Sequence, residues 1–281
     1  MSGAERNARK RKQAQQAAQA QAGHAAATDD DRTKKITFGV VTAIVIGAAI
    51  TIAAIFVLAN GGENGAAAEG DRGEGEIPAL AVDTGVPAER DGTVVVRGDD
   101  NAPTTIDVYA DFLCPACKGF EEAFAEEIDS YVADGQLRVR THLVPMLSDR
   151  SNPEGYSLHS ANAALCAADE GAFTAYHDSL FAAQPDFNNA YEVTDLVNLG
   201  RDLGLGDSFA ACVNEGTYEQ DLLDEFSEIR EDESVHQEFD DGHSGFSTPT
   251  VVHDGEVVDI SDERHWNEDW LAELIEQDQG A

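Results

Sequence analysis

The sequence is poor in basic side chains. Of its 281 residues, 18 are Lys or Arg and 54 are Asp or Glu, which gives a formal net charge of −36. Residues 1–35 hold eight of the basic and four of the acidic side chains, a local charge of +4, and subtraction leaves −40 for the rest. Such a surface repels phosphates, so we expect no nucleic-acid partner. Solubility or adaptation to salt explains the acidity, and a preference for cationic substrates is the competing interpretation.

Cysteine is also scarce, and metal-ligand spacings are missing. The four cysteines all follow residue 110. A structural zinc site usually needs four nitrogen or sulfur ligands in paired spacings. There is one Cys-X-X-Cys and no second, and the eight histidines form no ligand spacing. We therefore expect no metal and no cofactor, and an even cysteine count in an exported domain favours disulfides.

One stretch has no charge at all. Residues 36–58 are 23 uncharged, mostly apolar residues, and at about 1.5 Å per residue such a helix spans a hydrocarbon core. The eight basic residues that precede it place the N-terminal side in the cytoplasm and everything after it outside. A cleaved signal peptide is the alternative, but its apolar region normally has only about 7–15 residues. We expect an uncleaved single-pass anchor in the cell membrane.

The sequence divides into four parts on this basis. Residues 1–35 form a polar, basic, cytoplasmic tail without apolar periodicity. The anchor follows at 36–58. Residues 59–91 are rich in Gly, Ala and Glu and predict a flexible acidic linker. The remaining residues, 92–281, predict an extracytoplasmic folded domain.

The folded domain has an interrupted α/β pattern. Strand-like runs at 93–96, 105–110 and 137–143 precede a helical block at about 155–238, and strand signals return at 250–253 with a hairpin turn and a closing helix at 266–277. The block therefore predicts a helical insertion between the two halves of a small sheet. Its expected helices are 156–168, 172–183, 192–203, 207–214 and 218–238.

The redox motif is Cys114-Pro115-Ala116-Cys117, where the strand at 105–110 gives way to a helix. The first N–H groups of a helix carry partial positive charge, so a thiol placed there ionises more easily, and the thiolate is the reactive form. Cys117 repeats at helical spacing with Phe120 and Phe124 and is expected to face inward. Cys114 is then expected at an exposed tip, as the attacking thiol of the pair.

Three stretches carry a resemblance to a known family, namely residues 98–103, 109–117 and 247–255. They are similar to the DsbA-like thioredoxin-fold proteins, nearest to the membrane-anchored disulfide-forming type of actinobacteria. The resemblance covers about residues 93–278. It implies an α/β thioredoxin fold with an inserted helical subdomain and an enzyme that oxidises cysteine pairs in exported proteins.

The resemblance also assigns a role to Thr248 and Pro249. In that family this loop faces the cysteine pair and holds the substrate peptide by backbone pairing. A proline directly before a β run cannot donate a ladder hydrogen bond, so its position is unusual. Trans is favoured for X–Pro bonds in general, but with the cysteine motif present we expect a cis Thr248–Pro249 bond.

The residues around the pair tune its chemistry. Strongly oxidising members of the family often carry Pro-His between the cysteines, and this chain has Pro115-Ala116, so we expect a milder oxidant because one cationic neighbour is lost. Thioredoxin-like proteins often carry a buried acid six residues before the first cysteine, where this chain has Val108. Asp111 is an alternative proton relay to Cys117, and a turn-capping or solvated role is the competing interpretation.

Cys166 and Cys212 lie 46 residues apart in the helical block. An oxidising compartment favours a structural disulfide between them. Two buried free thiols or a second redox pair are the alternatives.

Three functions remain open at this point. The leading one is a membrane-anchored thiol–disulfide oxidase, whose partners would be unfolded exported proteins with cysteines and a separate membrane thiol oxidase that restores its disulfide. The second is a disulfide reductase or isomerase, for example in cytochrome maturation. The third is a non-catalytic extracytoplasmic binding module on the same fold, against which the intact motifs argue.

Overall fold

The computed structural model describes residues 76–81, 85–239, 242–262 and 265–280. The predicted cytoplasmic tail and membrane anchor, residues 1–58, lie outside this part of the chain. Within the described ranges, no helix is both long and apolar enough to cross a bilayer.

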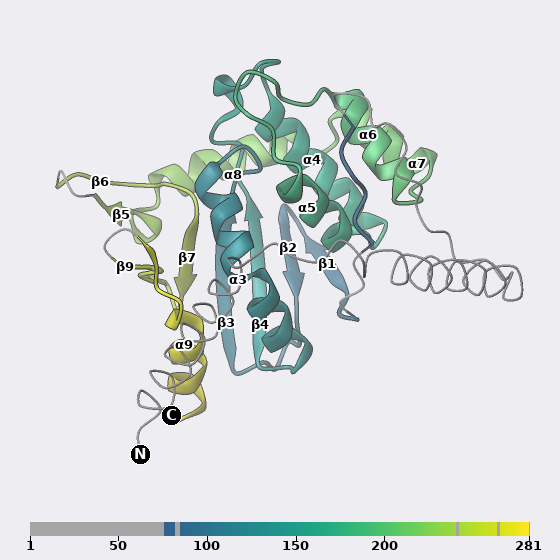
Figure 1. Ribbon diagram of the computed structural model, residues 1–281. Coiled ribbons are helices and arrows are strands. Elements are labelled where there is room, and N and C mark those ends of the chain that lie inside the picture. The colour runs from purple at the N-terminus through teal and green to yellow at the C-terminus, as the bar shows by residue number, and fades with distance from the viewer. Residues whose placement is uncertain (1–75, 82–84, 240–241, 263–264, 281) are drawn as a thin grey trace, which may run out of the picture. The chain divides into compact units, whose positions relative to one another are not determined.

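The centre of the domain is a six-stranded sheet (Figure 1). Strands β3 and β4 run parallel in the middle, and every other neighbouring pair in the sheet is antiparallel. Smaller two-stranded pairs join β5 with β6 and β9 with β10. The sheet order is β1 (Ala88–Asp91), β2 (Val94–Arg97), β4 (Leu137–Leu143), β3 (Thr104–Ala110), β7 (Thr250–His253) and β8 (Glu256–Val257), and the small pairs are β5 (Gln237–Glu238), β6 (Ser244–Gly245), β9 (Ser261–Asp262) and β10 (His265–Trp266).

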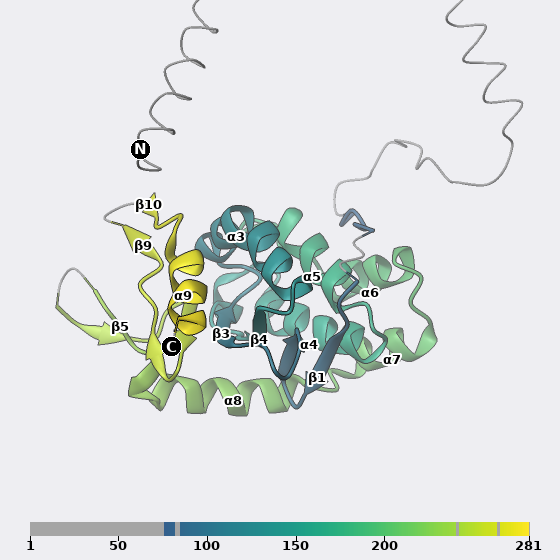
Figure 2. The same ribbon diagram turned by 90° about the horizontal axis from the view of Figure 1, so that it is seen from below.

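Helices cover both faces of the sheet. Ile106 and Val108 of β3 share a core with helices α3 (Pro115–Ala133) and α9 (Trp270–Gln279), and Tyr109 points to the opposite side and packs with α8 (Glu219–Glu231). Figure 2 shows α3 and α9 on one side of the strands and α8 across the other. The alternation follows from strand geometry, because successive side chains of a strand point to opposite faces.

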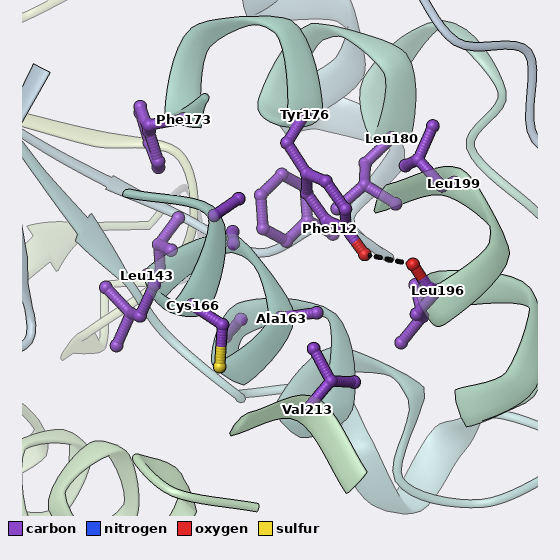
Figure 3. Packing of buried hydrophobic residues seen from close by; sticks show 14 of the residues in the cluster. Phe112, Leu143, Ala163, Cys166, Phe173, Tyr176, Leu180, Leu196, Leu199 and Val213 are labelled. Atoms are coloured by element: carbon purple, nitrogen blue, oxygen red, sulfur yellow. Dashed lines mark hydrogen bonds between the residues drawn. The ribbon is translucent and has the colours of Figure 1, made fainter. Parts of the chain in front are cut away.

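The predicted helical insertion is confirmed between β4 and β7. It contains α4 (Tyr156–Asp169), α5 (Phe173–Ala182), α6 (Val193–Asp202) and α7 (Asp207–Glu215), followed by α8. Figure 3 shows its packing, with the Tyr176 hydroxyl donating to the Leu196 carbonyl at 2.8 Å. Phe112, two residues before the cysteine pair, belongs to the same apolar cluster. The insertion and the start of α3 therefore share one core.

Two boundaries differ from the prediction. Strand β1 lies inside residues 59–91, which were expected to be linker, and Ile77 is also buried there. The sequence of β1, Ala-Glu-Arg-Asp, has no apolar alternation, so the sequence pattern did not predict a strand there. The strand forms through backbone pairing with β2. The helix expected at 218–238 ends at Glu231, because the Asp232 carboxylate accepts the Ser234 N–H and starts a separate short 3-10 turn.

Candidate active site

The cysteine pair opens helix α3. Cys114 is the residue before the first helical turn, Pro115 is the first helical residue, and the Lys118 N–H closes the turn on the Cys114 carbonyl at 3.2 Å. Proline suits this position because its missing N–H would have had no partner. Both thiols are free, so the structure shows the dithiol form of the pair.

The two thiols are both buried. Cys117 is 1% exposed and faces the core, as its helical spacing predicted. Cys114 is only 6% exposed, so the expectation of an exposed tip is wrong. The reason is a loop distant in sequence, because the Cys114 thiol lies against Thr248 and donates to its carbonyl oxygen at 3.3 Å.

The loop at Thr248 and Pro249 has the expected cis peptide bond. Side chains hold it in place on its far side, because the Gln237 amide donates to the Pro249 carbonyl at 3.0 Å and to the Thr250 hydroxyl at 2.5 Å. The Thr250 hydroxyl in turn donates to the Ser247 carbonyl at 2.6 Å. In the described part of the chain, the buried Thr248 hydroxyl has no hydrogen-bond partner while Cys114 is a thiol. Once Cys114 has lost its proton, this hydroxyl can donate to the sulfur and so lowers the pKa of Cys114.

The surroundings of the two thiols shift their pKa values in opposite directions. A hydrogen bond from the Cys117 thiol lowers the pKa of Cys114 to about 6, with further help from Thr248 and the backbone N–H groups of Cys117 and Ala116, although burial opposes the change. Burial raises the pKa of Cys117 well above its ordinary value, and the negative charge on Cys114 adds to this. At neutral pH the pair therefore holds one thiolate, on Cys114, and one thiol, on Cys117.

Asp111 lies behind the pair and is 1% exposed, so the solvated interpretation is wrong. Its carboxylate accepts the Leu113 N–H at 2.8 Å, the turn-capping contact, and also the Leu147 N–H at 2.8 Å and the Ser157 hydroxyl at 2.7 Å. Burial raises its pKa to about 6 against these three donors. Its contact with Cys117 runs through the backbone, where the Asp111 N–H faces the sulfur at 3.5 Å. The proton-relay role stays a prediction.

Gln184 is the site residue that the sequence analysis missed. It follows α5, and its side-chain amide donates to the Phe112 and Cys114 carbonyl oxygens, both at 3.0 Å. No motif marks this glutamine, and 70 residues separate it from Cys114. Only the packing of the insertion against the start of α3 brings the two together.

The other two cysteines lie in the insertion, apart from this site. Cys166 in α4 is bonded to Cys212 in α7, with Cα atoms 6.0 Å apart. The predicted pairing is therefore present, and the alternative of two free thiols is wrong. In the part of the chain that the structure describes, no three His, Cys, Asp or Glu side chains gather as metal ligands.

Comparisons of the sequence and of the structure show which known proteins this chain is similar to. The sequence profile of the thioredoxin family matches residues 90–276. The serine/threonine-protein kinase PknE of Mycobacterium tuberculosis is 32% identical over 192 residues, which cover 66% of this chain and 31% of that protein. The chain thus spans about a third of the length of this curated relative.

Solved structures give the same assignment. The reduced disulfide bond oxidoreductase DsbG of M. tuberculosis aligns with a TM-score of 0.53 and 28% identity, over 66% of this chain and 82% of that one. Reduced DsbA of M. tuberculosis aligns with a TM-score of 0.53 and 26% identity, over 66% and 86%. With the cysteine pair at the start of α3 and the helical insertion, the chain belongs to the thioredoxin family, as a DsbA-like thiol–disulfide oxidoreductase.

Proposed function

We propose that this protein is an extracytoplasmic thiol oxidase that introduces disulfides into exported proteins. The observation that supports it most is the separation of the two acidities, with the Cys114 pKa lowered to about 6 and that of Cys117 raised. A stabilised Cys114 thiolate favours the reduced enzyme, so the oxidised enzyme readily passes its disulfide on.

The reaction is two thiol–disulfide exchanges. A substrate thiolate attacks Cys114 in the Cys114–Cys117 disulfide, forming a mixed disulfide and releasing the Cys117 sulfur, which takes up a proton. A second substrate thiolate then attacks the substrate sulfur of the mixed disulfide and releases the Cys114 thiolate. The substrate gains one disulfide and loses two electrons, and the enzyme gains them as its dithiol.

Thr248 and Pro249 are the proposed substrate-binding residues. The Thr248 carbonyl faces the Cys114 sulfur, and both residues are buried in the dithiol form. The substrate segment carrying the attacking thiolate would lie along this loop, as the family resemblance implies. The Thr248 hydroxyl would then donate to the sulfur that carries negative charge.

Asp111 is the proposed proton relay for Cys117. Burial raises the pKa of its carboxyl to about 6, so near neutral pH it exchanges a proton more readily than an exposed aspartate. The variant Asp111→Asn tests this relay. Ser157→Ala is the control, because it removes one hydrogen-bond donor to Asp111 but keeps the carboxyl. A relay predicts a slower release of Cys117 in the first variant only, at and below about pH 6, where the Asp111 carboxyl of the wild type still holds the proton that it donates. Equal rates in both variants would remove Asp111 from the mechanism.

The reduction potential of residues 76–281 against glutathione decides between oxidase and reductase. We expect a value milder than that of the Pro-His type, because Ala116 places no cation beside the thiolate. A value as low as that of thioredoxin, about −270 mV, would contradict the oxidase. Isomerase activity would appear as refolding of a scrambled substrate without net oxidation.

Trapping separates an enzyme from a binding module. Cys117→Ala removes the resolving thiol. When its Cys114 thiolate attacks a disulfide of a substrate protein and releases one substrate thiolate, the mixed disulfide should accumulate. Cys114→Ala is the matched control and should trap nothing. If Cys117→Ala also trapped no protein that carries a disulfide, the binding module would be favoured.

The proposed location is the outer face of the cell membrane, held by the predicted anchor at 36–58. Support comes from the charge asymmetry of the sequence alone. The proposed partners are unfolded exported proteins with cysteines and a separate membrane thiol oxidase. Protease added to intact cells should digest the domain and spare the tail, and protection of the domain would overturn this topology.

A further inference from the structure

We propose that Gln184 is a positioning residue that, through its hydrogen bonds to the Phe112 and Cys114 carbonyls, stabilises the Cys114 thiolate, so that the helical insertion contributes to the redox potential of the pair. This inference rests on the proposed function, because it concerns the strength of the same oxidant. It goes beyond the cysteine pair and the Thr248 loop, since Gln184 contacts neither sulfur in the structure and acts through the peptide groups around Cys114.

The contacts of the Gln184 side-chain amide fix its orientation. Both atoms that Gln184 meets are carbonyl oxygens, those of Phe112 and Cys114, at 3.0 Å each. A carbonyl oxygen can only accept, so the NH₂ end of the side chain must face them, and each of its two hydrogens has one acceptor. The side-chain donors of Gln184 are therefore fully used on the Phe112–Leu113 and Cys114–Pro115 peptide groups.

Gln184 is itself held in place at the end of α5. Its backbone N–H donates to the Phe181 carbonyl at 3.2 Å, in the last turn of α5, and Pro185 follows and restricts the backbone before it. In the opposite direction, the Lys118 ammonium donates to the Ala182 carbonyl at 3.3 Å. The end of α5 and the start of α3 are thus joined by two side chains that reach across from opposite sides.

Aromatic side chains pack beside these hydrogen bonds. The Phe112 ring lies 4.9 Å from the ring of Phe181 and 5.6 Å from that of His177, both on α5 (centroid distances). Phe112 is therefore fixed to α5 through its side chain and, by way of Gln184, through its carbonyl. Asp111 fixes the same turn from the other side through the Leu113 N–H.

The electrostatic consequence concerns the Cys114 carbonyl. Its oxygen carries partial negative charge close to the sulfur of the same residue, and it accepts both the Lys118 N–H and the Gln184 amide. Donors on this oxygen offset its repulsion of the thiolate and keep the helix N-terminus directed at the sulfur. Removing the Gln184 donors should therefore raise the pKa of Cys114 and make the oxidised form less oxidising.

The test uses Gln184→Met, which keeps the length of the side chain and removes both donors, and Gln184→Glu, which places an acceptor against two acceptors. Gln220→Ala is the control, because its amide bonds Asp224 on the exposed face of α8. The readouts are the Cys114 titration by thiolate absorbance and the equilibrium with glutathione, in which enzyme disulfide and two glutathiones give enzyme dithiol and glutathione disulfide.

We expect the Cys114 pKa to be lowest in the wild type, higher in Gln184→Met and highest in Gln184→Glu. The rise from the wild type to Gln184→Met should be about 0.5 pKa unit. At pH 7 the Met variant should oxidise glutathione with an equilibrium constant about threefold smaller, equivalent to about 15 mV. The Gln220→Ala control should match the wild type in both readouts.

The outcomes separate this inference from the proposed function. If the wild type exchanges disulfides and the Met variant, folded by circular dichroism, keeps the wild-type pKa and equilibrium constant, Gln184 has only a packing role and the inference fails. If the wild type itself exchanges no disulfide with glutathione or a thiol protein, the proposed function fails. If Met and Glu both unfold the domain, Gln184→Asn, too short to reach both carbonyls, must raise the Cys114 pKa above the wild-type value, and an unchanged pKa would overturn the inference.

Discussion

The Cys114 sulfur lies 3.3 Å from the carbonyl oxygen of Thr248, although 134 residues separate them in the sequence. This contact buries the thiol that the helix start alone would have left exposed. It also places the thiol between two kinds of donor, the backbone N–H groups of α3 and the Thr248 hydroxyl. The acidity of Cys114 is therefore a property of the assembled fold and not of the four-residue motif.

The first prediction concerns this acidity. Absorbance of the thiolate in the reduced domain should rise with a midpoint near pH 6, because Cys117, Thr248 and the N–H groups of α3 lower the pKa of Cys114. Cys117 should stay a thiol throughout, since burial raises its pKa well above the ordinary value. Alkylation at pH 7 should accordingly label Cys114 first.

Cys114→Ser is the control for this titration and should remove the midpoint near pH 6. A midpoint close to that of a free cysteine, about 8.5, would show that the contacts around Cys114 do not stabilise its thiolate in solution. The proposed oxidase would then lose its main support.

The second prediction concerns His142 on β4. Its ring nitrogens lie 2.7 Å from an Asp107 oxygen and 3.1 Å from a Glu225 oxygen, and its ring stacks on Tyr109. Both partners are carboxylates, so both nitrogens must donate and the ring is charged. Burial lowers the pKa of His142, but the two carboxylates outweigh it and raise the pKa overall.

The sign of the pH dependence follows from the two shifts. The raised His142 pKa gives stability that is complete below about 6.5 and is lost as pH rises through the folded value. Burial opposes ionisation of Glu225, but hydrogen bonds from His142 and Thr93 lower its pKa overall, so its share is complete above about 4.5 and is lost on further acidification. The hydrogen bond between His142 on β4 and Glu225 on α8 should therefore stabilise the fold most between about pH 4.5 and 6.5.

Urea unfolding of His142→Gln and Glu225→Gln checks this. The loss of unfolding free energy in each variant should be largest inside that window, about 2 kcal/mol, the size of a hydrogen bond to a charged group. The double variant should lose less than the sum of the single variants. A loss independent of pH would mean that the ring is neutral in the folded domain.

The sequence predicted the parts of this molecule that depend on local pattern. The strand before Cys114, the inward face of Cys117 and the helical insertion all follow from apolar spacing. The Cys166–Cys212 pairing follows from the even cysteine count and from the expectation of an oxidising compartment. The burial of Cys114 and the contacts of Gln184 do not, because they arise where segments distant in sequence meet. Strand β1 was missed for a related reason, since its pairing with β2 uses backbone groups that every residue has.

The third prediction concerns the Cys166–Cys212 disulfide. Replacing both residues with Ala should lower the unfolding free energy by about 4 kcal/mol, because the bond closes a loop of 46 residues in the unfolded chain. The Cys114 titration and disulfide exchange should not change, since the bond lies between α4 and α7. Mass spectrometry after mild reduction should find this bond intact when the Cys114–Cys117 bond is already open. Equal ease of reduction would make it a second redox pair.

The fourth prediction concerns the contact between α6 and α7. A Cβ atom on Gly200 would clash with the ring of Phe209, which is 1% exposed. Alanine in a helix normally stabilises relative to glycine by about 1 kcal/mol, but here it should cost about 1–3 kcal/mol because the core has no room for it. Gly119→Ala in α3 is the matched control, since its Cβ would meet Trp266 at an ordinary 3.6 Å and should stabilise. Phe209→Leu should restore part of the loss in Gly200→Ala, and a stabilised Gly200→Ala would show that α6 and α7 pack less closely than the structure has them.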